Sequence, residues 1–303
     1  MPEIPSTPDR QSPAGVLFAF FAFLIWGLSP VYWKALGQVD ALEIILHRVI
    51  WSFAFLMPLV WFGRQWNDFK NALKRPRIMG ILLVTSILVG ANWLIYIWAV
   101  NNGRVLQASL GYYINPLVNI VLGMIFLGER LRRAQSVAVA LATLGVLNLA
   151  FRYGVFPWVS LALAFSFGLY GLVRKVAAVG PLAGLTVETL LLTVPAGLWV
   201  FHLHQNHTGA FLRSGGHIDL LLMGTGVLTA TPLLLFNLGA KRITLATLGF
   251  IQYTAPTGML LLGITMFDEP FTRIQAVTFG LIWIALAIYS WDTVRIHRQR
   301  PSR

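Results

Sequence analysis

The fold of this chain is decided by stretches such as residues 107–127, QASLGYYINPLVNIVLGMIFL. This stretch contains no charged residue, and its length is close to the roughly 20 residues that a helix needs to cross a hydrocarbon core about 30 Å thick. A helix pairs all of its backbone polar groups internally, as lipid requires. We therefore expect residues 107–127 to form a helix that spans a membrane.

Nine further stretches of similar length and composition surround this one. They run over residues 14–35, 44–62, 78–99, 134–151, 156–174, 185–203, 219–239, 247–267 and 274–292. None alternates steadily between polar and apolar residues, so the tilted strands of a membrane barrel are disfavoured. Charged residues make up 11% of the 303-residue chain, against about 25% in soluble domains. The sequence predicts an all-α polytopic membrane protein with ten transmembrane helices.

The 23 lysine and arginine residues are distributed unevenly between the two sides of the predicted bundle. With ten spans, 17 lie beside the termini or in loops on the same side, 5 lie on the other side, and Arg48 falls inside a span. The positive-inside rule then places both termini, segment 1–13 and the basic tail 293–303, in the cytoplasm. This bias explains the net charge of +12, so we predict no nucleic-acid partner. Residues 14–35 have no small-residue cleavage site, which favours a retained helix over a signal peptide.

The two halves of the chain resemble each other weakly at a shift of about 140 residues. Residues 26–28 (WGL) fall on 167–169 (FGL), and Pro116 and Glu129 fall on Pro256 and Glu269. We expect two five-helix repeats, residues 14–151 and 152–292. An odd number of spans inverts the second copy, an architecture common in transporters that bind solute at the seam and expose it to each side in turn. A duplicated scaffold without transport is the alternative.

Several strings of residues are more specific than this internal similarity. They are EIILHRVIWS (43–52), NWL (92–94), IWAVNN (97–102), ASLGYYINPLVN (108–119), GERL (128–131), YGLVRK (170–175) and LGFIQY (248–253). Over residues 14–292 the chain resembles the EamA-type drug/metabolite transporter family, in particular a branch associated with chloramphenicol sensitivity. The resemblance implies a bacterial inner-membrane protein of two five-helix repeats, in a superfamily that mostly exports metabolites or drugs. It does not fix the solute.

Polar and aromatic residues recur at helical spacing inside several spans, which favours a shared cavity between them. Proline within a span frees backbone carbonyls that can bind solute or water, and aromatic rings with one polar tip suit an amphipathic ligand. Helix packing and lipid contact are the alternatives. The predicted substrate-binding residues are Trp26, Asn92, Tyr96, Tyr112, Asn115, Asn119, Tyr170, Gln252 and Tyr253.

Three ionisable residues lie about one turn inside predicted span ends: His47, Arg48 and Glu188. His47 falls on Glu188 at a shift of 141 residues, so the repeats place a titratable group at equivalent depth on opposite sides. We predict coupling or gating roles for the three, because histidine and a partly desolvated glutamate can exchange a proton near neutrality. Snorkelling or a structural ion pair is the alternative.

Two further sets of residues are assigned simpler roles. Glu129 and Glu269, at matched span ends, are expected to anchor helix termini by binding backbone amides or a neighbouring arginine, with a gating role as the alternative. The histidines of residues 202–207, with His217, are interpreted as polar loop residues rather than as a zinc site. With no cysteine and no nucleotide-binding or hydrolase motif, we predict no metal and no cofactor.

Together these observations predict a secondary transporter of a small metabolite or drug-like solute, working by alternating access, with export favoured by the family resemblance. The expected partners are a small-molecule substrate and the lipid bilayer, and the working unit is one chain or a homodimer. A membrane enzyme acting through Glu188 and His47 is disfavoured because the two are predicted near opposite faces. A non-transporting scaffold is the third alternative.

Overall fold

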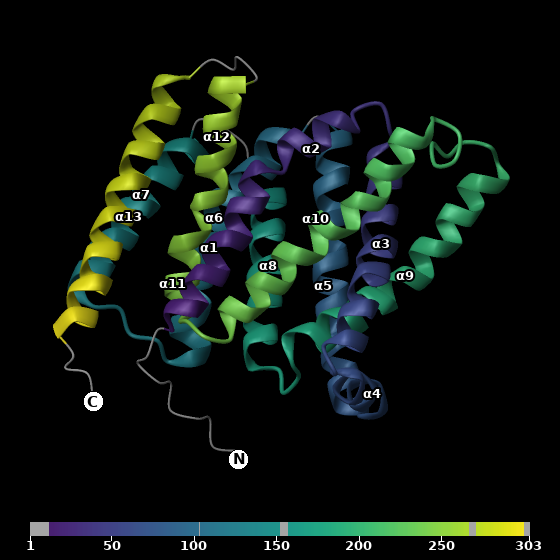
Figure 1. The fold of residues 1–303 in the computed structure, drawn as a ribbon. Coiled ribbons are helices and arrows are strands. Elements are labelled where there is room, and N and C mark those ends of the chain that lie inside the picture. The colour runs from purple at the N-terminus through teal and green to yellow at the C-terminus, as the bar shows by residue number, and fades with distance from the viewer. Residues whose placement is uncertain (1–11, 103, 152–156, 267–270, 300–303) are drawn as a thin grey trace.

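The computed structural model describes residues 12–102, 104–151, 157–266 and 271–299, and within these ranges it contains helices and no strand. Ten helical segments of the described chain are long and apolar enough to cross a membrane, which confirms the predicted number of spans. Figure 1 shows them as one bundle. The helices are α1 (Pro13–Leu28), α2 (Pro30–Ala35), α3 (Ala41–Phe62), α4 (Trp66–Lys74), α5 (Pro76–Asn101), α6 (Val105–Leu127), α7 (Arg133–Phe151), α8 (Trp158–Val176), α9 (Pro181–Gln205), α10 (Gly216–Ala240), α11 (Leu245–Gln252), α12 (Thr254–Met266) and α13 (Arg273–Gln299).

Two of the spans are interrupted. The first consists of α1 and α2, which are separated at Ser29, directly before Pro30. The ninth consists of α11 and α12, which are separated at Tyr253, three residues before Pro256. Proline lacks the backbone N–H that continues a helix, so a break close to a proline is expected. Irregular backbone within a membrane is tolerated where it is buried in protein or lines a cavity.

Helix α4 lies in a segment expected to be a loop, residues 63–77. It lies across one end of the bundle (Figure 1). Its own residues Phe69 and Ala72 are buried, and the helix packs on α9 and α5. Its amphipathic sequence explains why it covers the ends of neighbouring helices rather than spanning the membrane.

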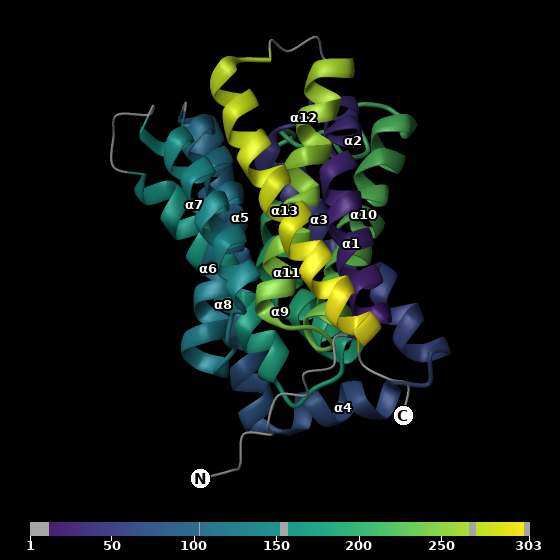
Figure 2. The same cartoon turned by 90° about the vertical axis from the view of Figure 1, so that its left-hand side faces the viewer.

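The bundle has two distinguishable ends. Helix α1 begins and α13 ends at the end where α4 lies, as Figures 1 and 2 both show. We call this the terminal end. The opposite end carries α2 and the connection between α9 and α10 (Figure 1). The described termini therefore lie on the same side of the bundle, as an even number of spans requires.

Helices of the two halves pack in matching pairs. Helix α1 packs on α10 as α8 packs on α5, and α6 packs on α8 as α1 packs on α12. These pairs are compatible with the predicted inverted repeat. The predicted boundary at residues 151 and 152 adjoins residues 152–156, which lie outside the described chain.

Helices α6 and α11, the fourth and ninth spans, touch at a glycine. A Cβ atom on Gly249 would lie 2.5 Å from the carbonyl oxygen of Pro116, so this crossing has no room for a side chain. The close approach brings the polar residues Asn115 and Gln252 within hydrogen-bonding distance of each other. It positions one wall of the candidate site.

Candidate functional site

A cavity of about 450 Å³ lies among the helices. This volume lies within the range of about 300–1,000 Å³ typical of small-molecule sites. Ser29, Trp33 and Ala41, which line it, lie where α1, α2 and α3 adjoin, so the cavity occupies the half of the bundle toward the opposite end (Figure 1). Its wall combines aromatic rings with a few polar groups, as ligand pockets commonly do.

Seven of the twelve residues predicted for binding, coupling or gating line this cavity. They are Trp26, Arg48, Asn92, Tyr96, Tyr112, Asn115 and Gln252. They come from α1, α3, α5, α6 and α11, which are distant in sequence. The other five, Asn119, Tyr170, Tyr253, His47 and Glu188, are not among the residues that line it.

The amide side chains of the cavity wall form a cluster. Gln252 donates to Oδ1 of Asn115 at 2.7 Å, and Asn119 donates to Oε1 of Gln252 at 2.8 Å and to Oδ1 of Asn115 at 3.2 Å. Asn115 in turn donates to the carbonyl oxygen of Ala164 at 2.8 Å, across to α8. Asn119 is fully buried and therefore supports Asn115 and Gln252 from behind the wall.

Tyr253 faces away from the cavity. Its ring is fully buried in a separate apolar cluster, and its hydroxyl donates to the carbonyl oxygen of Tyr113 at 3.3 Å. Since Tyr253 stands at the break between α11 and α12, regular helical spacing does not predict its direction. It takes a packing position in the structure.

A cluster of five aromatic rings closes the cavity toward the terminal end. Phe167 packs against Phe236 with ring centroids 5.2 Å apart, and Trp26 packs against both, at 5.8 and 6.0 Å. We call these rings the aromatic plug; it consists of Phe23, Trp26, Phe167, Tyr170 and Phe236. Phe23, Trp26 and Phe167 line the cavity, whereas Phe236 and Tyr170 are fully buried beneath them.

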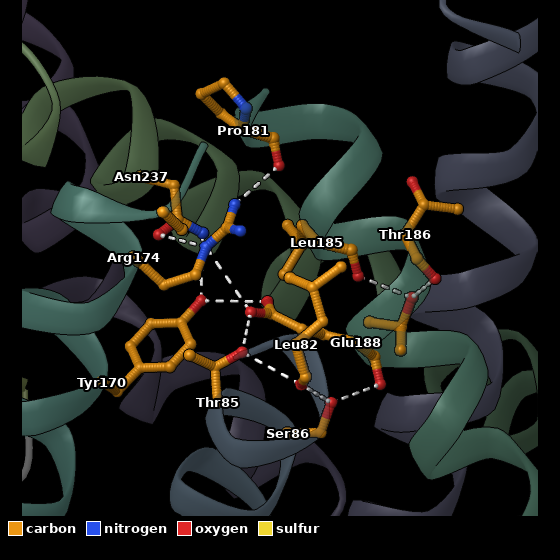
Figure 3. Close-up of polar contacts among 12 residues, drawn as sticks. Leu82, Thr85, Ser86, Tyr170, Arg174, Pro181, Leu185, Thr186, Glu188 and Asn237 are labelled. Carbon is orange, nitrogen blue, oxygen red and sulfur yellow. Dashed lines mark hydrogen bonds and ion pairs between the residues drawn. The ribbon is translucent and has the colours of Figure 1, made fainter. Parts of the chain in front are cut away.

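Glu188 lies on the far side of the aromatic plug, and Figure 3 shows its contacts. Its Oε1 atom lies 3.5 Å from Nε of Arg174 and accepts a hydrogen bond from Thr85 at 2.5 Å. Its Oε2 accepts one from the hydroxyl of Tyr170 at 3.4 Å. Tyr170 therefore joins the plug to this buried ion pair, rather than contacting a solute in the cavity.

Arg174 is the second charged member of this network, and sequence reasoning missed it because Arg174 is the last residue of a predicted span and was counted with the basic residues on the side of the termini. The structure buries it completely in the last turn of α8. It donates to Oδ1 of Asn237 at 3.3 Å and to the carbonyl oxygen of Pro181 at 3.1 Å, and Asn237 donates to the hydroxyl of Tyr170 at 3.0 Å (Figure 3). The network thus connects α5, α8, α9 and α10, and we call it the Arg174–Glu188 network.

Space around the guanidinium of Arg174 is limited by a glycine. A Cβ atom on Gly184, in the first turn of α9, would collide with the guanidinium of Arg174. Glycine at this position therefore admits the arginine between α8 and α9.

His47 belongs to a different polar cluster, toward the opposite end. Glu43, one turn earlier on α3, accepts backbone hydrogen bonds from Ala210 at 2.8 and 2.9 Å and from Phe211 at 3.0 Å. His47 lies 3.9 Å from this carboxylate and accepts a hydrogen bond from Trp51 at 3.2 Å. Glu43, which sequence reasoning also missed, fixes the connection between α9 and α10 to α3.

Glu129 binds backbone amides as predicted. It accepts hydrogen bonds from the N–H groups of Leu245 and Ala246, at 2.8 and 3.0 Å, at the start of α11. Glu269 lies outside the described residues. His202 contacts Asn206, and His207 contacts Arg213, in the α9–α10 connection. No group of three or more histidine or acidic side chains that could hold a metal is found among the described residues.

A bundle of ten apolar helices around a solute-sized cavity is the architecture of a multi-pass membrane transporter. Comparison with known proteins gives the family. The model of the EamA-like transporter family matches residues 13–151. Protein RarD of Salmonella typhi is 48% identical over 96% of this chain and 99% of its own length. An uncharacterized transporter of Vibrio cholerae is 47% identical over 98% of this chain and 99% of its own. The chain belongs to the EamA-like transporter family, as the resemblance predicted.

A solved structure shares the fold. It aligns with a TM-score of 0.72 over 92% of this chain and 97% of its own, at 19% sequence identity. At this identity the likeness is evidence for the fold alone.

Proposed function

We propose that the chain is a secondary transporter that moves a small amphipathic solute by alternating access. The observation that carries this proposal is the asymmetry of the cavity. It occupies the half of the bundle toward the opposite end, and the aromatic plug and the Arg174–Glu188 network close it toward the terminal end. A transporter with its site exposed to one side has this arrangement.

In this proposal the two polar clusters act as gates at different ends. Opening toward the terminal end requires the plug to part and the contacts of Glu188 with Arg174, Thr85 and Tyr170 to break. Protonation of Glu188 would remove the charge that holds Arg174, so Glu188 is the residue through which a proton would couple to movement. The contacts of Glu43 and His47 with the α9–α10 connection form the second gate.

The orientation follows from charge. Lys70, Lys74 and Arg75 of α4 and its C-cap lie at the terminal end, the end that the positive-inside rule assigns to the cytoplasm. We therefore propose that the chain lies in the bacterial inner membrane with both termini inside and the cavity facing outward. Residues 14–151 and 152–292 would be the two inverted repeats, and export is the direction favoured by the family resemblance.

Counterflow in liposomes tests transport and the assigned cavity together. Chloramphenicol is one solute to try first, because the resemblance is to a branch associated with chloramphenicol sensitivity, followed by hits from a thermal-shift screen. We expect saturable counterflow that falls at least about tenfold in Asn115→Ala and in Gln252→Ala, since each removes a donor or acceptor from the cavity wall. Tyr253→Phe, which removes only a hydroxyl outside the cavity, is the control.

Size-exclusion chromatography of each variant separates lost transport from lost folding. Unchanged counterflow in both amide variants would contradict the assigned cavity. If no screened solute shows counterflow while the chain still binds a partner protein, a non-transporting scaffold would be favoured instead. An enzyme acting through Glu188 and His47 is disfavoured, because the two residues belong to separate clusters toward different ends of the bundle.

A further inference from the structure

Arg48 places a cation in the wall of the cavity. Its Nε donates to Oγ1 of Thr229 at 2.9 Å, and its guanidinium lies 4.8 Å from the ring centroid of Trp33 and 5.2 Å from that of Trp93. The tryptophan faces hold the guanidinium in place by cation–π attraction. Neither ring neutralises its charge.

No carboxylate approaches Arg48 within the described part of the chain. The ion pairs found there join Glu43 to His47, Asp292 to Arg132 and Glu188 to Arg174. A charged side chain inside a membrane is costly, and natural proteins usually pair it or use it. No acidic neighbour among the described residues explains why an arginine lies in this cavity wall. Binding of an acidic ligand would explain it.

The groups around Arg48 are arranged to receive an acidic group. Only its Nε is engaged in a described hydrogen bond, which leaves the two terminal nitrogens for the two oxygens of a carboxylate or phosphate. Tyr96 and Tyr112 lie within electrostatic range of Arg48, and their hydroxyls have no hydrogen-bond partner among the described residues. These hydroxyls can donate to the same anion.

Apart from Ser29 and the amides Asn92, Asn115 and Gln252, the rest of the cavity wall is mostly apolar and aromatic. Trp26 and Phe167 of the aromatic plug line it, Leu233 packs in the same core cluster as the plug, and Met259 adds a flexible apolar surface from α12. A ligand that matches this wall has an apolar or aromatic body and one acidic head.

We infer that Arg48 binds the acidic head group of an amphipathic anion, a carboxylate or phosphate carried on an apolar body, in the cavity. This inference rests on the proposed function, because it names the class of solute that the transporter carries. Thr229, Trp33 and Trp93 position the guanidinium, and Tyr96 and Tyr112 supply additional donors.

Arg104 provides a matched control. Its guanidinium also lies near two tryptophan rings, 5.3 Å from the centroid of Trp98 and 5.7 Å from that of Trp158, but it is exposed and does not line the cavity. If stacking on tryptophan is the whole role of Arg48, substitution of either arginine should affect anion binding equally. If Arg48 binds an anion in the cavity, only its substitution should weaken anion binding.

The test is a binding titration of the purified full-length chain with three probes that share one body: 4-phenylbutyrate, its neutral amide and 4-phenylbutylamine. Isothermal calorimetry gives the Kd, and 3-phenylpropyl phosphate distinguishes a phosphate site from a carboxylate site. We expect the acid to bind at least about tenfold more tightly than the amide, and the amine to bind most weakly. Arg48→Gln should abolish the preference for the acid, Arg48→Lys should keep part of it, and Arg104→Gln should keep all of it.

The order of the three probes in the wild-type chain is a test that does not depend on any variant folding. Equal binding of acid and amide, or an acid preference that survives Arg48→Gln, would overturn the inference. If the inference fails in this way, counterflow of a neutral solute would still support the proposed transport. If the chain prefers the acid but shows no counterflow of any solute, the proposed transport is contradicted and the anion site is supported.

Discussion

Arg174 and Arg48 are both held inside the helix bundle, but the chain surrounds them in opposite ways. Arg174, toward the terminal end, is fully buried and lies 3.5 Å from the carboxylate of Glu188. Arg48, toward the opposite end, lines a cavity and has tryptophan rings and a hydroxyl around it but no carboxylate among the described residues. The first arginine has its partner within the chain, and the second is arranged to receive one from outside.

This difference shows how one residue type can close one end of a bundle and bind ligand at the other. A buried ion pair links the elements that carry its members, here α8 and α9, and removing one member leaves an uncompensated charge. A cation in a cavity wall is uncompensated already, so removing it should change the stability of the unliganded protein little. The two sites therefore predict responses of different size to substitution.

The largest expected effect is at Glu188. Glu188→Gln should lower the free energy of unfolding by about 3–5 kcal/mol, because it leaves the guanidinium of Arg174 buried without a carboxylate. The double variant Arg174→Met with Glu188→Leu should recover most of that loss, because it removes both charges. Thermal unfolding in the same detergent compares the wild type, the single variant and the double variant. A double variant that is less stable than Glu188→Gln would contradict the pairing.

The next effect concerns the space around Arg174. Gly184→Ala should destabilise the protein by about 1–3 kcal/mol, because the added methyl group collides with the guanidinium. Gly197→Ala is the matched control on the same helix, since its Cβ would meet nothing within 4 Å, and it should raise stability by about 0.5–1 kcal/mol. Equal responses at the two glycines would show that Arg174 does not fill this space tightly.

A smaller effect is expected at Arg48. Arg48→Gln should change the stability of the unliganded chain by no more than about 1 kcal/mol, since the lost contacts with Trp33, Trp93 and Thr229 are offset by removal of an unpaired charge. Arg174→Gln, measured beside it, should be far more destabilising. Similar losses at both arginines would remove the distinction between the two sites.

The last effect is a pH dependence close to Arg174. Burial, and to a lesser extent the charge of Arg174, lowers the pKa of Lys241 from its ordinary value of 10.5 to about 8. Between these values the unfolded chain binds more protons at this residue than the folded chain, so Lys241 should make stability rise with pH across this window. Lys241→Met should flatten that part of a pH series of thermal unfolding; an unchanged slope would show that Lys241 is not the group responsible.

The sequence predicted the spans and half of the site for clear physical reasons. Membrane helices are long and apolar, so their number can be read directly, and the amide residues of α6 and α11 stand out because polar residues are rare in such helices. Their meeting across the α6–α11 crossing depends on Gly249, where a Cβ atom would lie 2.5 Å from the carbonyl oxygen of Pro116.

The remaining residues of the site could not be predicted because their roles depend on partners from other helices. Arg174 lies at the end of a span, where basic residues are usually in water, and only the positions of Glu188 and Asn237 show that it is buried. Tyr253 stands at a helix break, so its direction does not follow from periodicity. Tyr170 lies one turn beyond Phe167, and that step in depth carries it past the cavity to Glu188.

The most direct test of alternating access asks whether a cavity residue can be reached from both sides of the membrane. The chain has no cysteine, so Met259→Cys places a single thiol in the cavity wall, and Met266→Cys places a control thiol at the exposed end of the same helix. Both variants are treated with a membrane-impermeant thiol reagent in right-side-out and in inside-out vesicles. The account predicts that the Met259→Cys thiol reacts from both sides, more slowly from the terminal end, and that the Met266→Cys thiol reacts only from the opposite end. Reaction of the Met259→Cys thiol from the opposite end alone, even in the presence of a bound solute, would contradict it.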